Sequence, residues 1–234
     1  MKVGLLECDH VAERFRRIAG DYRDMFAALF SRYAPQFSLD CFDVCNGRFP
    51  LSLDACDAYL CTGSRYSVYE DVGWIHWLKD FVKQAYRADK PFVGICFGHQ
   101  LLAEALGGKT ERATQGWGVG VHSLNVIRAE EWMQPMQLSC KLHFMHQDQV
   151  QQLPEDGVLL GQSDHCPVAM FRVGNTMLGI QGHPEFPAAY SEAFILDRIE
   201  RIGADSALAA RASLSQATDE EVVARWIAEF LERR

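Results

Sequence analysis

The 234-residue sequence has no long apolar run and no cluster of basic residues. A membrane helix needs about 20 consecutive, mostly apolar residues, and no window reaches that length. The formal net charge is −8, which argues against a surface for nucleic acid or an anionic membrane. The N-terminus lacks the basic region and the small-residue cleavage site of a signal peptide. We therefore expect a globular cytoplasmic protein with no membrane or nucleic-acid partner.

The cysteines lack the spacing of any zinc module, and they would form disulfides only in an oxidising compartment. We expect most of them to be reduced core residues, and we predict no metal and no cofactor. The eight are Cys8, Cys41, Cys45, Cys56, Cys61, Cys96, Cys140 and Cys166.

The chain has no internal repeat, low-complexity tract or linker, so we expect one domain over residues 1–234 with a C-terminal helical extension over about 187–234. Apolar runs of strand length alternate with amphipathic stretches. This pattern predicts an α/β fold with a mostly parallel, open, flavodoxin-like sheet covered by helices on both faces. Closely spaced short strands after Lys109 predict a smaller antiparallel section.

The expected elements follow from hydrophobic periodicity and from turn residues. The last helix would begin with a capping box formed by Thr218 and Glu221. We expect strands at 2–8, 37–44, 57–63, 91–96, 117–127, 141–150, 157–163, 167–173 and 176–182, and helices at 11–33, 74–86, from Cys96 to Gly107, and at 218–234.

The stretch "PFVGICFGHQ", residues 91–100, places a cysteine between two glycines where a strand turns into a helix. This arrangement is typical of a nucleophile elbow, in which Gly94 and Gly98 avoid a collision across the sharp turn. The positive end of a helix dipole also favours an anionic thiolate. A buried structural cysteine at a strand end is the alternative. We interpret Cys96 as a nucleophile.

A second stretch, "GIQGHPEF" at residues 179–186, supplies the groups that a thiol nucleophile needs. His183 can transfer protons, and Glu185 can hold the imidazole. Pro184 keeps the segment extended, so that residues two apart point to the same side. A lone histidine at a strand end is usually structural, but one that precedes Pro-Glu in a chain with a cysteine elbow favours a Cys-His-Glu triad.

These residues resemble the class I, or triad-type, glutamine amidotransferases. "GICFGHQ" is similar to the nucleophile motif of that family and "GHPE" to its His and Glu motif. "CTGSRYSVYED" at residues 61–71 resembles the oxyanion loop, and "HFMHQDQVQQLP" at 143–154 resembles the strand that lines the glutamine pocket. The resemblance spans roughly residues 40–190 in the right order, and is strongest to free-standing members that look like the glutaminase half of GMP synthetase.

The resemblance implies a role for each matching residue. Cys96 is the expected nucleophile, His183 the base and acid, and Glu185 the group that orients it. Backbone N–H groups of Gly63 and Phe97 would form the oxyanion hole. Many family members have a Gly-Gly pair in this loop where the sequence has Thr62-Gly63. The identity of the second oxyanion donor is therefore left open.

The substrate pocket is also implied by the resemblance. Gln100 matches a substrate-contacting glutamine and lies one helical turn after the thiol. Backbone around His146 and Gln147 would hold the amino-acid head of the substrate. We expect His99 to be a buried helix residue and Asp148 a turn or strand-end carboxylate.

The expected reaction is hydrolysis of a γ-carboxamide through a cysteinyl thioester, which releases glutamate and, from glutamine, ammonia. No part of the sequence resembles a synthase domain, so a separate synthase subunit would accept the ammonia. The alternative is a γ-glutamyl peptide hydrolase, whose pocket mouth near Arg65, Tyr66 and Tyr69 would admit a larger leaving group. A third possibility is a non-enzymatic, redox-sensing cysteine module. An enzyme is favoured over the sensor because a sensor has no use for a substrate-side glutamine such as Gln100. The glutaminase is favoured over the peptide hydrolase because Cys96, Gln100 and the His-Pro-Glu motif resemble that family closely.

Overall fold

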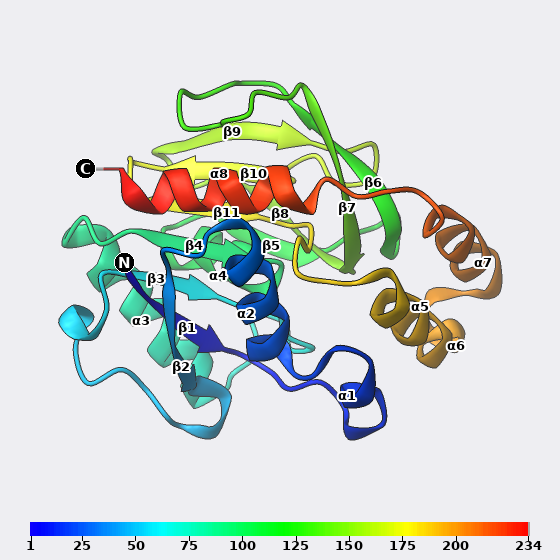
Figure 1. Cartoon of the computed structure of the whole chain (residues 1–234), viewed down its shortest axis with the longest axis horizontal. Helices are drawn as coiled ribbons and strands as arrows, with labels where there is room; N and C mark the ends of the chain where they lie inside the picture. Colours follow the sequence, from blue (N-terminus) through cyan, green and yellow to red (C-terminus); the bar gives the residue numbers. More distant parts are fainter. Residues whose placement is uncertain (234) are drawn as a thin grey trace.

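The computed structural model describes residues 1–233 as eleven strands and eight α-helices (Figure 1). The strands are β1 (Lys2–Glu7), β2 (Ser38–Asp43), β3 (Ala58–Cys61), β4 (Phe92–Ile95), β5 (Lys109–Arg112), β6 (Gly118–Val126), β7 (Ser139–His146), β8 (Asp148–Gln152), β9 (Gly157–Gln162), β10 (Met170–Val173) and β11 (Met177–Ile180). The helices are α1 (Glu13–Ala19), α2 (Tyr22–Tyr33), α3 (Gly73–Arg87), α4 (Phe97–Ala105), α5 (Ala188–Asp197), α6 (Ile199–Ile202), α7 (Ala204–Ser213) and α8 (Glu220–Glu232).

Nine strands form one sheet in the order β2-β1-β3-β4-β11-β10-β9-β6-β7, and β5 pairs with β8 in a separate ribbon. The five strands from β2 to β11 are parallel, whereas the strands from β11 to β7 and the β5–β8 ribbon are antiparallel. The prediction of an α/β fold with a mostly parallel sheet and a smaller antiparallel section is confirmed.

Helices cover both faces of the parallel strands, as predicted. Along β1, Leu5 packs with α2 and α8 in one buried cluster, while Leu6 packs with α3 and α4 in another. The alternation follows from the two-residue period of a strand, and both faces are buried because the sheet lies between two layers. Figure 1 shows α2 and α8 in front of the sheet, with α5, α6 and α7 gathered at one end.

Two expected strands differ from the structure. The segment 141–150 is divided into β7 and β8, because the chain turns at Gln147, whose carbonyl accepts a hydrogen bond of 2.9 Å from the Ala113 N–H. Strand β11 was expected only in the antiparallel section, yet it also lies parallel to β4. It therefore joins the two parts of the sheet, and its carboxyl end lies beside that of β4.

Two expected helices also differ. The helix over 11–33 is divided into α1 and α2, because Gly20 has φ 77° and the Asp21 side chain caps a new helix in a box with Asp24. The capping box of Thr218 and Glu221 is wrong. Asp219 is the N-cap residue of α8 and no side chain caps its N–H groups, while the Thr218 hydroxyl donates to Glu220 at 2.7 Å. Residue 234 lies outside the described part.

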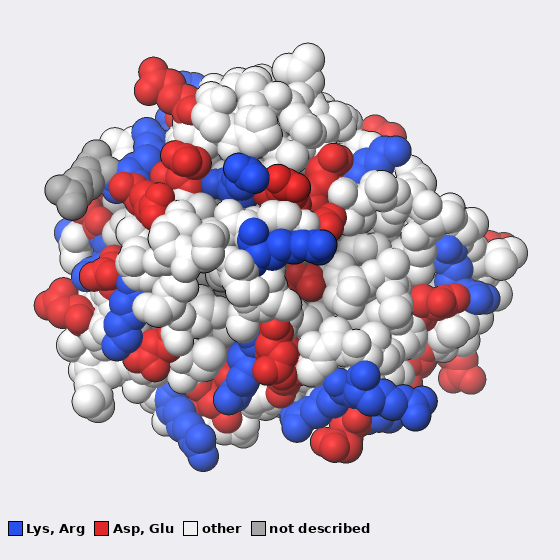
Figure 2. Space-filling view, in the orientation of Figure 1, with Lys and Arg blue, Asp and Glu red and all other residues white. Residues whose placement is uncertain are grey.

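Two surface properties bear on partners. Within residues 1–233 no helix combines the length and apolar character that a membrane span needs. Figure 2 shows acidic and basic side chains interspersed over most of the visible face, with several basic side chains adjoining one another at the lower right.

Candidate active site

Cys96 occupies the turn between β4 and α4, in a backbone conformation that non-glycine residues rarely adopt. Its φ is 52° and its ψ is −98°. A Cβ at Gly94 would overlap the Gly98 carbonyl, and a Cβ at Gly98 would lie 2.5 Å from the Cys61 carbonyl oxygen. The turn is therefore as sharp as an elbow requires, and it needs both glycines. Only 5% of Cys96 is exposed.

The next strand in the sheet holds this turn in place. The Cys96 N–H donates to the Ile180 carbonyl at 2.9 Å, at the end of β11. The chain then continues from Ile180 to His183, whose own N–H donates to the His143 carbonyl at 2.7 Å. Because β4 and β11 are parallel neighbours, the thiol and the imidazole leave the sheet at the same edge.

His183 and Glu185 form a buried pair. His183 Nδ1 donates to Glu185 Oε1 at 2.8 Å, and both residues are at most 5% exposed. The imidazole lies flat on Phe186, with 3.9 Å between ring centroids and 10° between planes. A carboxylate on Nδ1 leaves Nε2 free for a proton transfer, and the stacked ring fixes the orientation of the imidazole.

Burial lowers the pKa of His183, but the negative charge of Glu185, the Cys96 sulfur and the hydrogen bonds to both raise it more, to about 10. The His183 imidazole is therefore in its protonated, cationic form at neutral pH. Its proton can be given to a leaving amine.

Gly63, which follows β3, lies against both reacting groups. A Cβ at this position would lie 3.0 Å from His183 Cε1 and 3.7 Å from Cys96 Cβ. Among the residues of the described chain, neither the Gly63 N–H nor the Phe97 N–H has a hydrogen-bond acceptor. The Thr62 hydroxyl donates to the Gly63 carbonyl at 3.1 Å and accepts from the Cys8 N–H at 3.0 Å, so it fixes this peptide.

Two hollows meet at Cys96. We call the smaller, of about 100 Å³, the Gln100 hollow; its walls include Tyr66, Ser67, Gln100, His146, Gln147 and Asp148. We call the larger, of about 190 Å³, the His183 hollow; its walls include Tyr22, Gly63, His183, Phe186, Tyr190 and Phe194. Arg65 and Arg198 line both hollows. Arg65 and Tyr66 thus lie where a pocket mouth was expected, whereas Tyr69 lines neither hollow within the described residues.

Gln100 uses its amide nitrogen within the protein. It donates to the Asp148 carbonyl at 2.7 Å and to Gln181 Oε1 at 3.1 Å. Only the side-chain oxygen of Gln100, Oε1, remains free to accept a hydrogen bond from a substrate. Asp148 is more than a strand-end carboxylate, because its side chain accepts a 2.5 Å hydrogen bond from the Ser67 hydroxyl and so ties the loop after Gly63 to β8.

His146 and Gln147 lie in the wall of the Gln100 hollow, as expected from the sequence. The His146 side chain is buried and faces Gln149 Nε2 at 3.2 Å. Burial and the neighbouring imidazoles lower the pKa of His146 well below its usual value. His99 is fully buried against Phe171, and burial lowers its pKa to about 3, so it is a neutral residue behind the site. Cys61 is buried, with its sulfur 3.2 Å from that of Cys8.

The far wall of the His183 hollow was not predicted from the sequence. Phe186, which stacks on His183, is followed by Tyr190 and Phe194. The Phe186 and Tyr190 rings meet edge to face with centroids 4.8 Å apart, and the Tyr190 and Phe194 rings stack with centroids 5.5 Å apart. The Arg198 guanidinium lies 3.6 Å above the Phe194 ring. The i, i+4 spacing of these residues was a readable helical signal, but its position beside the thiol was not.

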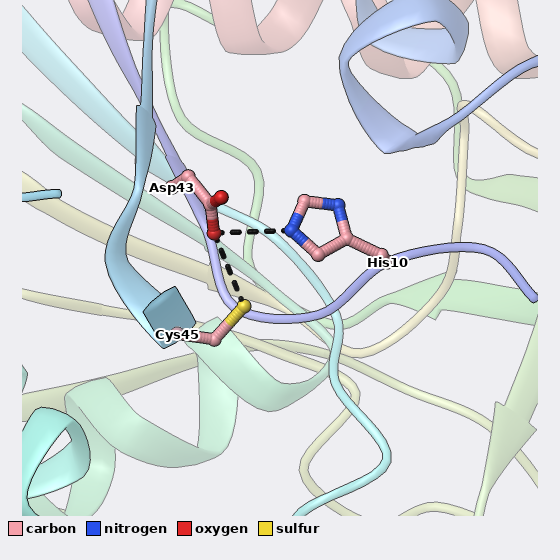
Figure 3. Close-up of side chains that lie close together, drawn as sticks. All are labelled: His10, Asp43 and Cys45. Carbon is pink, nitrogen blue, oxygen red and sulfur yellow. Dashed lines mark hydrogen bonds and ion pairs between the residues drawn. The ribbon is translucent and has the colours of Figure 1, made fainter. Parts of the chain in front are cut away.

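One cluster near the site has metal-ligand residue types. His10, Asp43 and Cys45 offer ligand atoms within 4.8 Å of one another (Figure 3). Glu7, His10 and Asp21 do the same. His10 Nδ1 lies 2.9 Å from Asp21 Oδ2, and its Nε2 lies 3.0 Å from Asp43 Oδ1. Burial and the Asp43 hydrogen bond raise the pKa of Cys45 to about 12. These contacts fit a protonated imidazole between two carboxylates, which has no lone pair for a metal.

The fold and the site define a class: an α/β protein with a cysteine elbow and an adjacent His–Glu pair is typical of enzymes that act on amides through a thiol. The family model of class I glutamine amidotransferases matches residues 65–199, more than half of the chain. The chain belongs to that family.

Known relatives agree with this membership. Gamma-glutamyl peptidase 3 of Arabidopsis thaliana is 32% identical over 85% of this chain and 80% of its own length. Gamma-glutamyl peptidase 5 of the same plant is 33% identical over 80% of this chain and 75% of its own length. The crystal structure of a glutamine amidotransferase from Thermotoga maritima shares the fold, with a TM-score of 0.77, 20% identity, and coverage of 99% and 96% of the two chains.

Proposed function

We propose that the protein hydrolyses γ-glutamyl peptides through a cysteinyl thioester. The sequence by itself favoured glutamine as substrate, with these peptides as the alternative. The names of relatives that match most of the chain, such as gamma-glutamyl peptidase 3, support the alternative better. One observation carries the proposal: the larger hollow lies on the His183 side of the thiol. Ammonia leaving from glutamine needs no such space, whereas the amino acid leaving from a γ-glutamyl peptide does.

In the first half of the reaction, the thiol proton of Cys96 lies on His183 Nε2, and Cys96 Sγ attacks the γ-carbonyl carbon of a substrate whose glutamyl part lies in the Gln100 hollow. The carbonyl oxygen becomes negative and accepts hydrogen bonds from the Gly63 and Phe97 N–H groups. His183 Nε2 gives its proton to the amide nitrogen, the C–N bond breaks, and the free amine leaves through the His183 hollow. A thioester between Cys96 and the glutamyl group remains.

In the second half, water enters the space left by the amine. His183 takes a proton from this water, which attacks the thioester carbonyl carbon. The C–S bond breaks, glutamate is released and Cys96 is restored. Glu185 keeps the imidazole in one orientation and stabilises its charged form in both halves. We assign no step to a metal or a cofactor.

We also propose that residues 1–234 act as one domain. Trp226 and Phe230 of α8 lie in the same buried cluster as the sheet residues Leu5 and Val93. The helices after residue 187 supply walls of the His183 hollow. The C-terminal extension predicted from the sequence would therefore be needed for both the core and the site.

The deciding experiment compares the kcat/KM values of the purified chain for glutamine and for γ-glutamyl dipeptides, with glutamate release as the readout. We expect the dipeptides to be preferred by more than about tenfold, or roughly 1.4 kcal/mol of transition-state stabilisation. A preference for glutamine would favour the ammonia donor, and a synthase subunit would then have to be sought. The matched control is Cys96→Ser, which should release no glutamate from either substrate.

A labelling experiment separates the enzyme from a redox-sensing module. A diazoketone analogue of glutamine should modify Cys96 alone, because the Gln100 hollow places the analogue at this thiol. Cys41 is more exposed and serves as an internal control for non-specific alkylation. Equal labelling of several cysteines, or labelling that persists in Cys96→Ser, would contradict the assignment of Cys96 as the nucleophile and of the Gln100 hollow as the substrate pocket.

A further inference from the structure

The His183 hollow has a charge that the protein itself leaves unmatched. Three guanidinium groups, those of Arg14, Arg65 and Arg198, line it together with two carboxylates, those of Asp9 and Asp197. Arg14 forms a salt bridge with Asp197, in which Nη2 lies 2.6 Å from Oδ1 and 2.7 Å from Oδ2. Arg65 lies 3.7 Å from Asp9, which also accepts the Arg65 N–H at 3.0 Å. Within residues 1–233, the Arg198 guanidinium has no carboxylate within 4 Å.

The Arg198 guanidinium lines the His183 hollow without a partner anion among the described residues. Arg198 lies between α5 and α6, and its guanidinium rests on Phe194. Burial lowers the pKa of Arg198 despite the neighbouring hydroxyls of Tyr22 and Tyr190, which raise it. A half-buried, unpaired guanidinium carries a desolvation penalty that a ligand carboxylate would relieve.

A series of contacting aromatic rings gives a path from the reacting groups to this cation. It starts at His183, which protonates the leaving amine in the proposed mechanism, and runs through Phe186, Tyr190 and Phe194 to Arg198. An amino acid that leaves as an amine at His183 would lie along these rings. Its carboxylate would then point to the guanidinium.

We propose that Arg198 binds a carboxylate of the leaving group. The Gln100 hollow has another guanidinium, that of Arg201, which lies 5.5 Å from the Trp117 ring centroid. The carboxylate of the γ-glutamyl part therefore has a partner of its own, and Arg198 is available to the opposite end of the substrate. This inference rests on the proposed function. It narrows the substrates to γ-glutamyl amino acids and peptides that carry a free carboxylate, and it excludes γ-glutamyl amines.

The test combines a change in the substrate with a change in the protein. The substrates are γ-glutamylalanine and its neutral counterpart, γ-glutamylalaninamide, with glutamine as a third. The variants are Arg198→Met, Arg198→Lys and, as a matched control in α7, Arg211→Met, whose guanidinium pairs with exposed Glu192. The kcat/KM of each protein is measured for each substrate, and folding is checked by circular dichroism.

We expect the wild type to prefer the acid to the amide by at least tenfold. Arg198→Met should lose at least tenfold for the acid and less than threefold for the amide and glutamine, while Arg198→Lys keeps part of the preference and Arg211→Met keeps all of it. Equal losses for all three substrates would assign Arg198 to the γ-glutamyl carboxylate instead and overturn the proposal. Equal wild-type rates for acid and amide would overturn it without any variant.

A binding measurement separates this inference from the proposed reaction. Calorimetry on Cys96→Ser, with and without Arg198→Met, compares the affinities for the acid and the amide. If the wild type cleaves neither peptide, the proposed function fails. A tenfold binding preference for the acid that disappears with Arg198→Met would still support the subsite, and equal affinities would refute it.

Discussion

The backbone strain at Cys96 makes a prediction about stability that is independent of catalysis. With φ 52° and ψ −98°, any residue with a Cβ is strained at this position, whereas glycine is not. Replacing Cys96 by alanine removes the sulfur and keeps the strain. Replacing it by glycine removes both. The difference in unfolding free energy between these two variants therefore isolates the strain.

The size of this difference follows from two opposing effects. A non-glycine residue in a sparsely populated backbone region costs about 1–3 kcal/mol. Glycine loses about 0.5–1 kcal/mol more than alanine through backbone entropy. Cys96→Gly should thus be more stable than Cys96→Ala by about 0.5–2 kcal/mol, or a few degrees in Tm for a chain of this size.

The assay is urea unfolding followed by circular dichroism, with Tm as a second readout. The matched control is Ala103→Gly in α4, a buried position with ordinary helical backbone. There the same change from alanine to glycine should destabilise the protein by about 1 kcal/mol or more. If Cys96→Gly were less stable than Cys96→Ala by a similar amount, the elbow would carry no strain and this reasoning would be refuted.

Three further predictions concern the site. His183→Ala should lower kcat/KM by at least about 10³-fold, while Glu185→Gln retains more activity because the base remains; wild-type glutamate release by either variant would remove it from the mechanism. Gly63→Ala should lower kcat by about 10²–10³-fold, since the added Cβ would lie 3.0 Å from the imidazole; Gly73→Ala, where a Cβ meets nothing within 4 Å, should be neutral in the same assay. Burial lowers the pKa of His10, but the hydrogen bonds to its two carboxylates raise it more, so it ends above 6.5. Its stabilising effect should be complete below that pH and lost as the pH rises through the folded-state pKa; urea unfolding of the wild type and His10→Asn should therefore differ more at about pH 5.5 than at about pH 9, and a pH-independent difference would contradict the charged pair.

Local patterns predicted the turn at Cys96 and the contact of His183 with Glu185, because each geometry is encoded within a few residues. The elbow requires Gly94 and Gly98 on either side of Cys96. The two-residue spacing of an extended segment brings Glu185 to His183, and the structure has these side chains 2.8 Å apart. The alternation of apolar runs with amphipathic stretches likewise predicted the parallel sheet, because the apolar run of each buried strand can be recognised within its own few residues.

Features that depend on distant contacts could not be predicted. Gln147 ends a strand because it pairs with Ala113, and nothing near 147 indicates this. Thr62 stands where many family members have a glycine. Its hydroxyl fixes the Gly63 peptide by hydrogen bonds to Gly63 and to the distant Cys8, which directly follows β1. Arg198 lines both hollows because of where α5 and α6 pack in the fold, and its sequence neighbourhood resembles that of any surface arginine.

The position of β11 also has a consequence for the order of folding during synthesis. This strand lies between β4 and β10 in the sheet, but it comes more than 80 residues after β4 in the chain. Until residues 177–180 leave the ribosome, β4 has an open edge with unpaired backbone groups, which is a site for wrong strand pairing. The Cys96 N–H also lacks the Ile180 carbonyl until then. A nascent chain therefore carries the Cys96 thiol on an unfinished turn, which is completed only after residues 177–180 have been made.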